Sequence, residues 1–283
     1  QKALARQNKN VTKARTALRA SILEKTQAAL AIFDDESFDE STSLMVLSAV
    51  AGVTSAPTES DVNLRLQSLN LTRNVLEKVK TGGVKVGQDT MNLVIGSLGN
   101  TLDDLSTAVS AETVSVEVNT SATTSNDEIK KVDENSKKVT DGIKATLNVL
   151  RDAIMIDAVA GEEPLKVVGK DLSVTVQKLP KRNNDSNIPD NTTSKISLGP
   201  AVAEGEQSAG FDIPSSALPF DDDVEVLATS FATNIYDSTK TVAGTIGLSL
   251  SKSGINMPVN NLDQGSEIIV GFPVTYTYGV LPT

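Results

Sequence analysis

The chain has 283 residues and a formal net charge of −10, from 26 Lys and Arg against 36 Asp and Glu, and this length supports a hydrophobic core without disulfides or metals. The acidic balance argues against nucleic acid and anionic membrane as partners, because both bind clusters of Lys and Arg. The chain contains no Cys, His or Trp, which excludes a Ser-His-Asp triad, a thiol nucleophile and an ordinary zinc site.

Apolar residues recur at helical spacing from residue 1 to about residue 158, which predicts a helical subdomain. The first helix carries one apolar stripe, made of Leu4, Val11, Ala14, Leu18 and Ile22. A second stripe begins with Leu44, Leu47 and Val50. Each stripe has the spacing of an amphipathic helix with one apolar face.

Three further helices follow. Thr58 with Asp61 resembles a capping box at the start of the third, whose stripe comprises Val62, Leu66, Leu69, Leu76 and Val79. The fourth begins after Gly82-Gly83 and has its stripe at Met91, Val94, Ile95, Leu98, Leu102 and Leu105; Gly96 and Gly99 within it are interpreted as points of close helix packing. Ser125 with Glu128 is expected to cap the fifth and longest helix, whose stripe comprises Ile129, Val132, Val139, Ile143, Leu147, Leu150 and Ile154.

The periodicity changes from 3.6 to 2 after Pro164, which predicts an antiparallel β-sandwich. The expected strands are Leu165–Val168, Leu172–Gln177, Ile196–Leu198, Phe211–Ile213, Val224–Phe231, Thr245–Lys252 and Ile268–Phe272. One further strand is expected near residues 113–118, inside the helical part, because Val114, Val116 and Val118 alternate with polar residues. The predicted class is therefore α+β, with a helical subdomain at 1–124, a long connecting helix at 125–160 and a β-sandwich subdomain at 161–283.

Four acidic clusters are the densest candidates for carboxylate catalysis or a Ca²⁺ site: Asp34-Asp35-Glu36, Asp103-Asp104, Glu162-Glu163 and Asp221-Asp222-Asp223. Neighbouring carboxylates on a loop usually point into water, so we interpret them as solvated turns. None matches the Ca²⁺ loop template, and "VIGSLGNTL" lacks the Lys of a phosphate-binding loop. A Ser-Lys dyad has no supporting context in the sequence. We therefore predict no enzyme, and no catalytic, cofactor-binding or metal-binding residue.

Five Asn-x-Ser/Thr sequons occur in the chain, at Asn10, Asn70, Asn119, Asn184 and Asn191. Asn119, Asn184 and Asn191 lie in predicted loops, where a glycan can be accommodated, and are the glycosylation candidates. Asn10 and Asn70 fall within predicted helices. The chain begins at Gln1 and has no apolar run of about 18 residues, so we expect it to be an internal piece of a longer protein with no direct membrane insertion in this segment.

Several phrases resemble, in the same order, the GAIN domain of the polycystin-1 family, the REJ-containing relatives of adhesion receptors. They are "AVAGEEPLKVVGKDLSV", "FDIPSSAL", "DDVEVLATSFATNIY" and "TVAGTIGLSLSKSGINMPVNNLDQGSEIIVGFPV". Upstream, "SLMVLSAVAGVTSAPTESDVNLRLQSLNLTRNVLEKV" is similar to the helical lead-in of such domains. The resemblance implies a helical subdomain followed by a β-sandwich. It departs from the family at the self-cleavage site, because this chain lacks the Cys, Trp and His-Leu-Thr residues of that site.

The resemblance implies a non-enzymatic extracellular scaffold or adhesion module of a polycystin-1-like membrane protein, on the plasma or ciliary membrane, that transmits force or partner binding. Its expected partners are proteins, namely a C-terminal strand beyond Thr283 that pairs beside residues 268–272, and neighbouring subunits. The alternative is a structural subunit of a surface filament or ciliary or flagellar appendage, since low aromatic content and Ser/Thr/Asn-rich loops are typical of secreted assembly proteins. A flagellin-like chain would pair helices from both termini, whereas this C-terminal part has the pattern of a strand.

Overall fold

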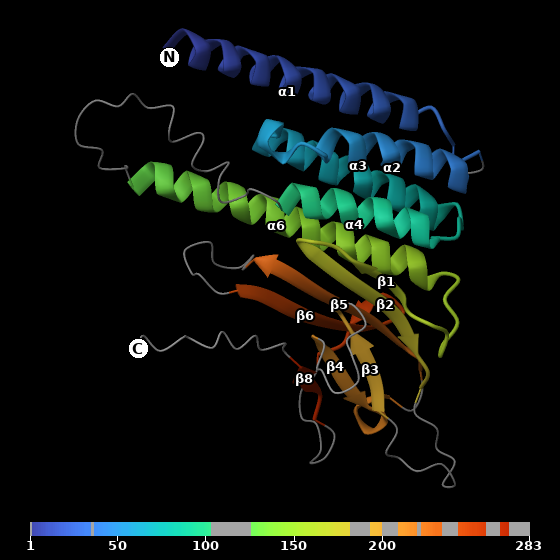
Figure 1. Cartoon of the computed structure of the whole chain (residues 1–283). Coiled ribbons are helices and arrows are strands. Elements are labelled where there is room, and N and C mark those ends of the chain that lie inside the picture. The colour runs from blue at the N-terminus through green and yellow to red at the C-terminus, as the bar shows by residue number, and fades with distance from the viewer. Residues whose placement is uncertain are drawn as a thin grey trace, which may run out of the picture. The chain divides into compact units, whose positions relative to one another are not determined.

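The fold is described from a computed structural model (Figure 1), and the description covers residues 2–34, 37–102, 126–181, 193–199, 209–219, 222–233, 243–258 and 267–271. Within these ranges, helices occupy the first part of the chain and antiparallel strands the second, which confirms the predicted α+β class. The chain divides into two compact units. The helical unit comprises residues 1–159, 169–172 and 231–245, and the β unit comprises residues 160–168, 173–230 and 246–283.

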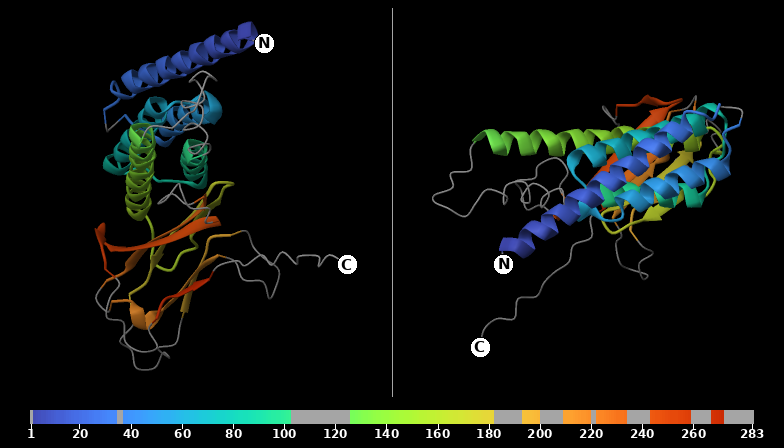
Figure 2. Two further views of the ribbon diagram at one scale, coloured as in Figure 1. Left: turned by 90° about the vertical axis from the view of Figure 1, so that its left-hand side faces the viewer. Right: turned by 90° about the horizontal axis from the view of Figure 1, so that it is seen from above.

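The helical unit contains the helices α1 (Lys2–Leu30), α2 (Glu40–Thr54), α3 (Val62–Thr81), α4 (Gln88–Leu102) and α6 (Asn126–Met155), and the short 3₁₀ turn η1 (Pro57–Glu59). The most extensive helix–helix contact is between α3 and α6, and α2 packs mainly on α4 and α3. The N-terminal part of α1 extends past α2 and α3 (Figure 2). The core of this unit is therefore built by α2, α3, α4 and α6, with α1 on its outside.

The predicted stripe of α6 is confirmed over the part whose side chains are described, because Val139, Ile143, Leu147, Leu150 and Ile154 are all buried. A strict repeat of apolar residues at threes and fours places them on one face of a helix. The stripe of α4 is confirmed in the same way from Met91 to Leu102. Ser125 and Leu105 lie outside the described residues, and of Ile129 and Val132 only the backbone is described.

The predicted close packing at Gly96 and Gly99 is wrong. A Cβ atom added at either position meets no heavy atom within 4 Å, so neither glycine is required by a neighbouring helix. The close approach is instead at Gly142 of α6, where a Cβ would lie 2.9 Å from Leu69 Cδ1 of α3. This close approach is in the helix pair with the most extensive contact, α3 and α6.

The predicted cap of α3 is also wrong in its position. The N-cap is Asp61, whose Oδ1 accepts a hydrogen bond of 2.8 Å from the backbone N of Leu64. Thr58 lies in η1, which Pro57 begins and which ends at Glu59. Because Asp61 is extended and its carboxylate satisfies one free N–H of the first turn, the aspartate caps the helix alone.

The apolar stripe of α1 is not its buried face. Leu18 is 63 % exposed, whereas Leu23 and Leu30 are buried. Nearer the N-terminus, Thr16 and Arg19 donate hydrogen bonds to Glu59 in the segment after α2. The packing face of α1 thus includes polar side chains that form hydrogen bonds, and a count of apolar residues alone selects the wrong side of the helix.

The β unit holds two sheets. The strands are β1 (Leu165–Val168), β2 (Leu172–Leu179), β3 (Thr193–Ser197), β4 (Gly210–Pro214), β5 (Val224–Thr233), β6 (Ala243–Lys252), β7 (Ile255–Asn256) and β8 (Ile269–Gly271), and the 3₁₀ turn η2 (Ser215–Ala217) follows β4. Their order is β1-β2-β5-β6-β7 in one sheet and β3-β4-β8 in the other. One hydrophobic cluster contains side chains of both sheets, among them Ile196 and Ile213 of the smaller sheet and Val226 of the larger. The finer expectation of a β-sandwich stays a prediction.

Each of the seven strands expected after Pro164 overlaps an observed one, and β1 has the expected bounds. The sequence patterns missed β7, which pairs with β6 after a tight turn. In that turn Ser253 and Gly254 have φ angles of 51° and 76°. The buried carboxylate of Glu225 supports it, because its Oε2 accepts hydrogen bonds from Ser251 Oγ at 2.8 Å and from the backbone N of Gly254 at 3.1 Å. The strand expected near residues 113–118 lies outside the described residues.

Candidate functional site

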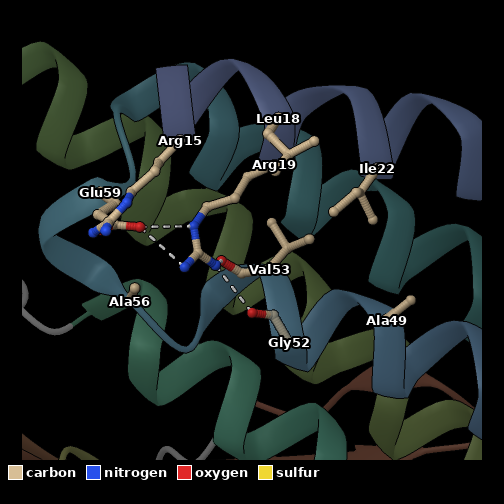
Figure 3. Close-up of a pocket in the computed structure, with 9 residues that line it drawn as sticks. All are labelled: Arg15, Leu18, Arg19, Ile22, Ala49, Gly52, Val53, Ala56 and Glu59. Atoms are coloured by element: carbon tan, nitrogen blue, oxygen red, sulfur yellow. Dashed lines mark hydrogen bonds and ion pairs between the residues drawn. The ribbon is translucent and has the colours of Figure 1, made fainter. Parts of the chain in front are cut away.

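A groove of about 490 Å³ runs between α1 and the C-terminal half of α2 (Figure 3). Its apolar wall is formed by Leu18 and Ile22 of α1 and by Ala49 and Val53 of α2. Its polar end is formed by Arg15, Arg19 and Glu59. We call this feature the α1–α2 groove.

Two arginines of α1 bind the carboxylate of Glu59 at the polar end. Arg15 Nη1 lies 2.6 Å from Glu59 Oε1, and Arg19 donates from Nε at 3.2 Å and from Nη2 at 3.1 Å to Glu59 Oε2. Both carboxylate oxygens are therefore engaged, in the charge-assisted geometry that fixes a guanidinium most strongly. Thr16 Oγ1 adds a bond of 2.8 Å to the carbonyl oxygen of Glu59.

Arg19 also caps the C-terminus of α2. Its Nη1 donates to the carbonyl oxygens of Gly52 at 3.1 Å and Val53 at 2.7 Å. The last carbonyls of a helix have no partner within the helix, and a cation there also interacts favourably with the helix dipole. One side chain of α1 thus ties the end of α2 to η1 and holds the groove in shape.

The two guanidinium groups determine the ionisation of Glu59. The hydrogen bond from Arg15 is the largest influence and, together with Arg19, holds the pKa of Glu59 below its usual value of 4.5. The carboxylate is consequently ionised at neutral pH and its charge is matched by its partners. Such a group is a poor proton donor or acceptor for catalysis, so the arrangement favours a binding surface over a reaction centre.

Acid is expected to weaken the attachment of α1. A lowered pKa in the folded state means that Glu59 stabilises the fold above pH 4.5, and that this contribution is lost as the pH falls through the folded-state pKa. In thermal unfolding followed by circular dichroism, Glu59→Gln should lose less stability than the wild type between pH 7 and pH 3, because it lacks this contribution at every pH. Hydrogen bonds from Ser37 and Thr42 also lower the pKa values of Asp34 and Asp39. This effect is the same in the wild type and in Glu59→Gln, so it does not alter the comparison.

The matched control is Glu24→Gln, which changes an exposed carboxyl group of α1. It should keep the acid dependence of the wild type. An acid dependence of Glu59→Gln equal to that of the wild type would show that the contact between α1 and η1 does not depend on this carboxylate.

Most described residues of the acidic clusters are exposed. Asp34, Glu162, Glu163 and Asp222 face solvent, as the interpretation of solvated turns predicts. Asp223 departs from it, because it is half-buried and its Oδ1 accepts a hydrogen bond of 3.0 Å from the backbone N of Lys181. Asp35, Glu36, Asp103, Asp104 and Asp221 lie outside the described residues. In the part of the chain that is described, no three acidic residues come together in a way that could hold a metal ion.

One Ser-Lys contact forms that the sequence did not indicate. Lys166 Nζ of β1 donates to Ser197 Oγ of β3 at 3.0 Å and to the carbonyl oxygen of Gly199. Burial lowers the pKa of Lys166 below its usual value of 10.5. Thr175 of β2 makes a parallel link, from Oγ1 to the carbonyl oxygen of Ser197 at 2.8 Å. Because Lys166 donates to a carbonyl and both polar links run from the larger sheet to Ser197 of β3, we interpret the contact as a structural link between the two sheets.

Sequence reasoning missed the α1–α2 groove, since Arg19 and Glu59 are 40 residues apart. The glycosylation candidates Asn119, Asn184 and Asn191 lie outside the described residues. The other two sequon residues, Asn10 and Asn70, are exposed on α1 and α3. Over the described ranges, no helix is both long and apolar enough to cross a membrane. No family model matches the chain, and no curated protein does.

Proposed function

We propose that the chain is a non-enzymatic extracellular scaffold or adhesion module, similar to the GAIN domain of polycystin-1-like membrane proteins, with its two sheets forming a β-sandwich. Its function is to bind protein partners and to transmit force, or the effect of partner binding, to a membrane-attached part. The observation that carries the proposal is the order of the elements. A helical unit precedes two antiparallel sheets that share one hydrophobic cluster, which is the order that the resemblance implies.

The phrases of the resemblance coincide with observed elements. "FDIP" forms most of β4 and "VEVLATSFAT" forms β5, while β6, its tight turn and β7 form within "AGTIGLSLSKSGIN". The described parts of these three phrases thus consist mainly of strands and the tight turn between β6 and β7. This agreement supports the proposed likeness to the GAIN domain. The chain still lacks the Cys, Trp and His residues of that family's self-cleavage site.

The edge of the smaller sheet supports a role in partner binding. Strand β8 is the last strand in the order β3-β4-β8 and pairs with β4 through Phe211↔Val270 and Asp212↔Ile269. Ile269 and Val270 are both exposed. An edge strand with exposed apolar residues is a template on which a further strand adds by main-chain hydrogen bonds. We propose that a strand beyond Thr283 or from a neighbouring subunit pairs there.

The filament alternative is supported less well. Its flagellin-like form pairs an N-terminal helix with a C-terminal one, whereas the main described contacts of α1 are with α2, α3 and η1. Long N-terminal helices such as α1 are compatible with either function.

Location on the cell tests the proposal. The structure offers exposed lysines, since the side chains of Lys137 and Lys170 are 80 % and 78 % exposed. An amine-reactive biotin reagent that does not cross membranes is therefore expected to label the protein on intact cells of its source. A cytosolic protein of the same cells is the control and should be labelled only after lysis.

A further inference from the structure

Two glycosylation sequons of nearly the same sequence lie in different surroundings. Asn-Val-Thr at residues 10–12 is in α1, and Asn-Leu-Thr at residues 70–72 is in α3. Both have Thr in the third position and a branched aliphatic residue in the second, so as acceptor sequences they are closely matched. A difference in glycan occupancy between them therefore reports on the fold around each one.

The sequon in α1 is accessible along its whole length. Asn10 and its two sequon partners are exposed, as are the described side chains on either side, those of Gln7 and residues 13–15. The N-terminal part of α1 extends past α2 and α3 (Figure 2). The described hydrogen bonds from α1 to η1 and α2 begin at Arg15, on the C-terminal side of the sequon. A bulky glycan on Asn10 would therefore extend into solvent without displacing a neighbour.

The sequon in α3 is held by packing. The side chain of Asn70 is exposed, and its Oδ1 accepts a hydrogen bond of 3.0 Å from Arg73 Nη2. Leu71 and Thr72, however, are each 1 % exposed. Thr72 Oγ1 donates a hydrogen bond of 2.9 Å to the carbonyl oxygen of Ser68. The hydroxyl group of this sequon is thus in the core of the helical unit.

A sequon in a helix has to unwind before it can react. The carboxamide of the Asn and the hydroxyl of the Thr must reach one enzyme site together, but residues two apart do not face each other on a helix. Around Asn10, unwinding breaks mainly hydrogen bonds within α1, and a helical segment with little tertiary packing is only marginally stable in water. Around Asn70, it also exposes buried side chains of α3. The fold therefore leaves the first sequon open to modification and closes the second.

We propose that Asn10 carries an N-linked glycan and that its occupancy exceeds that of Asn70. The donor is an oligosaccharide linked to a lipid pyrophosphate. Nδ2 of Asn10 forms a bond to C1 of the first sugar, the bond from that carbon to the pyrophosphate oxygen breaks, and Nδ2 gives up one proton to solvent. The lipid pyrophosphate is the leaving group. This site rests on the proposed function, because N-glycans are added to proteins that enter the secretory pathway.

The full chain, directed by an added secretion signal into the secretory pathway of a eukaryotic host, tests the site without depending on where the chain resides in its source. Digestion with a peptide glycosidase in water labelled with heavy oxygen converts each glycosylated Asn to a labelled Asp, which mass spectrometry measures site by site. In the wild type, Asn10 is expected to be labelled, and in a higher fraction of molecules than Asn70. Both sites are read in one sample, so each is the control for the other.

Two variants separate the glycan from other modifications of the same peptide. Thr12→Ala removes the sequon hydroxyl and should abolish the label at Asn10, whereas Thr12→Ser keeps the hydroxyl and should retain it. An unlabelled Asn10 in the wild type, a label that survives Thr12→Ala, or a labelled fraction no higher than that of Asn70 overturns the inference. None of these results bears on the location of the chain in its source, which surface biotinylation measures separately.

Discussion

Replacing Arg65 with Met is expected to destabilise the helical unit by about 3–5 kcal/mol. Arg65 is 1 % exposed, and its guanidinium donates to the carbonyl oxygens of Ser60 at 3.2 Å, Thr101 at 2.7 Å and Pro57 at 3.1 Å. Met fills a similar volume but donates nothing, so three carbonyls lose their partner, at about 1–3 kcal/mol for each one that stays buried. Urea unfolding followed by circular dichroism measures the change in the free energy of unfolding.

The control for Arg65→Met is Arg73→Met on the same helix. Arg73 donates from Nη2 to Asn70 Oδ1 at 3.0 Å on the exposed side of α3, and surface changes of this kind usually stay within about 0.5 kcal/mol. Arg65→Lys should recover part of the loss, since Lys keeps a charged donor. A loss of less than about 1 kcal/mol for Arg65→Met would contradict the role of this side chain as the link between η1, α3 and the end of α4.

Replacing Gly210 with Ala is expected to cost about 3 kcal/mol or more and to disrupt the pairing of β3 with β4. A Cβ at this position would lie 2.3 Å from the carbonyl oxygen of Ile196 and 3.3 Å from Ser197 Cα. Gly210 pairs directly with Ser197. These atoms belong to the backbone of the neighbouring strand, so no side chain can move aside and the strands must separate.

The matched change is Gly96→Ala in α4, where a Cβ meets nothing within 4 Å. Ala is favoured over Gly inside a helix, so this variant should gain about 0.5–1 kcal/mol. Amide hydrogen exchange locates the effects, with faster exchange in β3 and β4 expected for Gly210→Ala alone. Equal exchange in these strands for the wild type and Gly210→Ala would show that the strands do not approach as closely as the structure indicates.

The sequence predicted the fold best where one physical signal dominated. The stripe from Val139 to Ile154 in α6 is an uninterrupted helical repeat, and all five residues are buried. The strands after Pro164 were predicted from alternation and turn residues. The two-residue strand β7 was missed because it is too short to show a period, and it forms because Glu225 holds the preceding turn.

The sequence did not predict the α1–α2 groove, because its structure depends on polar contacts between distant residues. Arg15 and Arg19 are four residues apart, which places them on one side of a helix, but nothing nearby indicates that Glu59 is their common partner. The same contacts turn Leu18 outward.

The extracellular location of the chain is the central claim, and surface biotinylation of intact cells measures it most directly. The proposal predicts that the protein is captured with the biotin label before lysis, in the same fraction as known surface proteins, because exposed lysines such as Lys137 and Lys170 face the medium. Capture only after lysis, together with the cytosolic control, would contradict it.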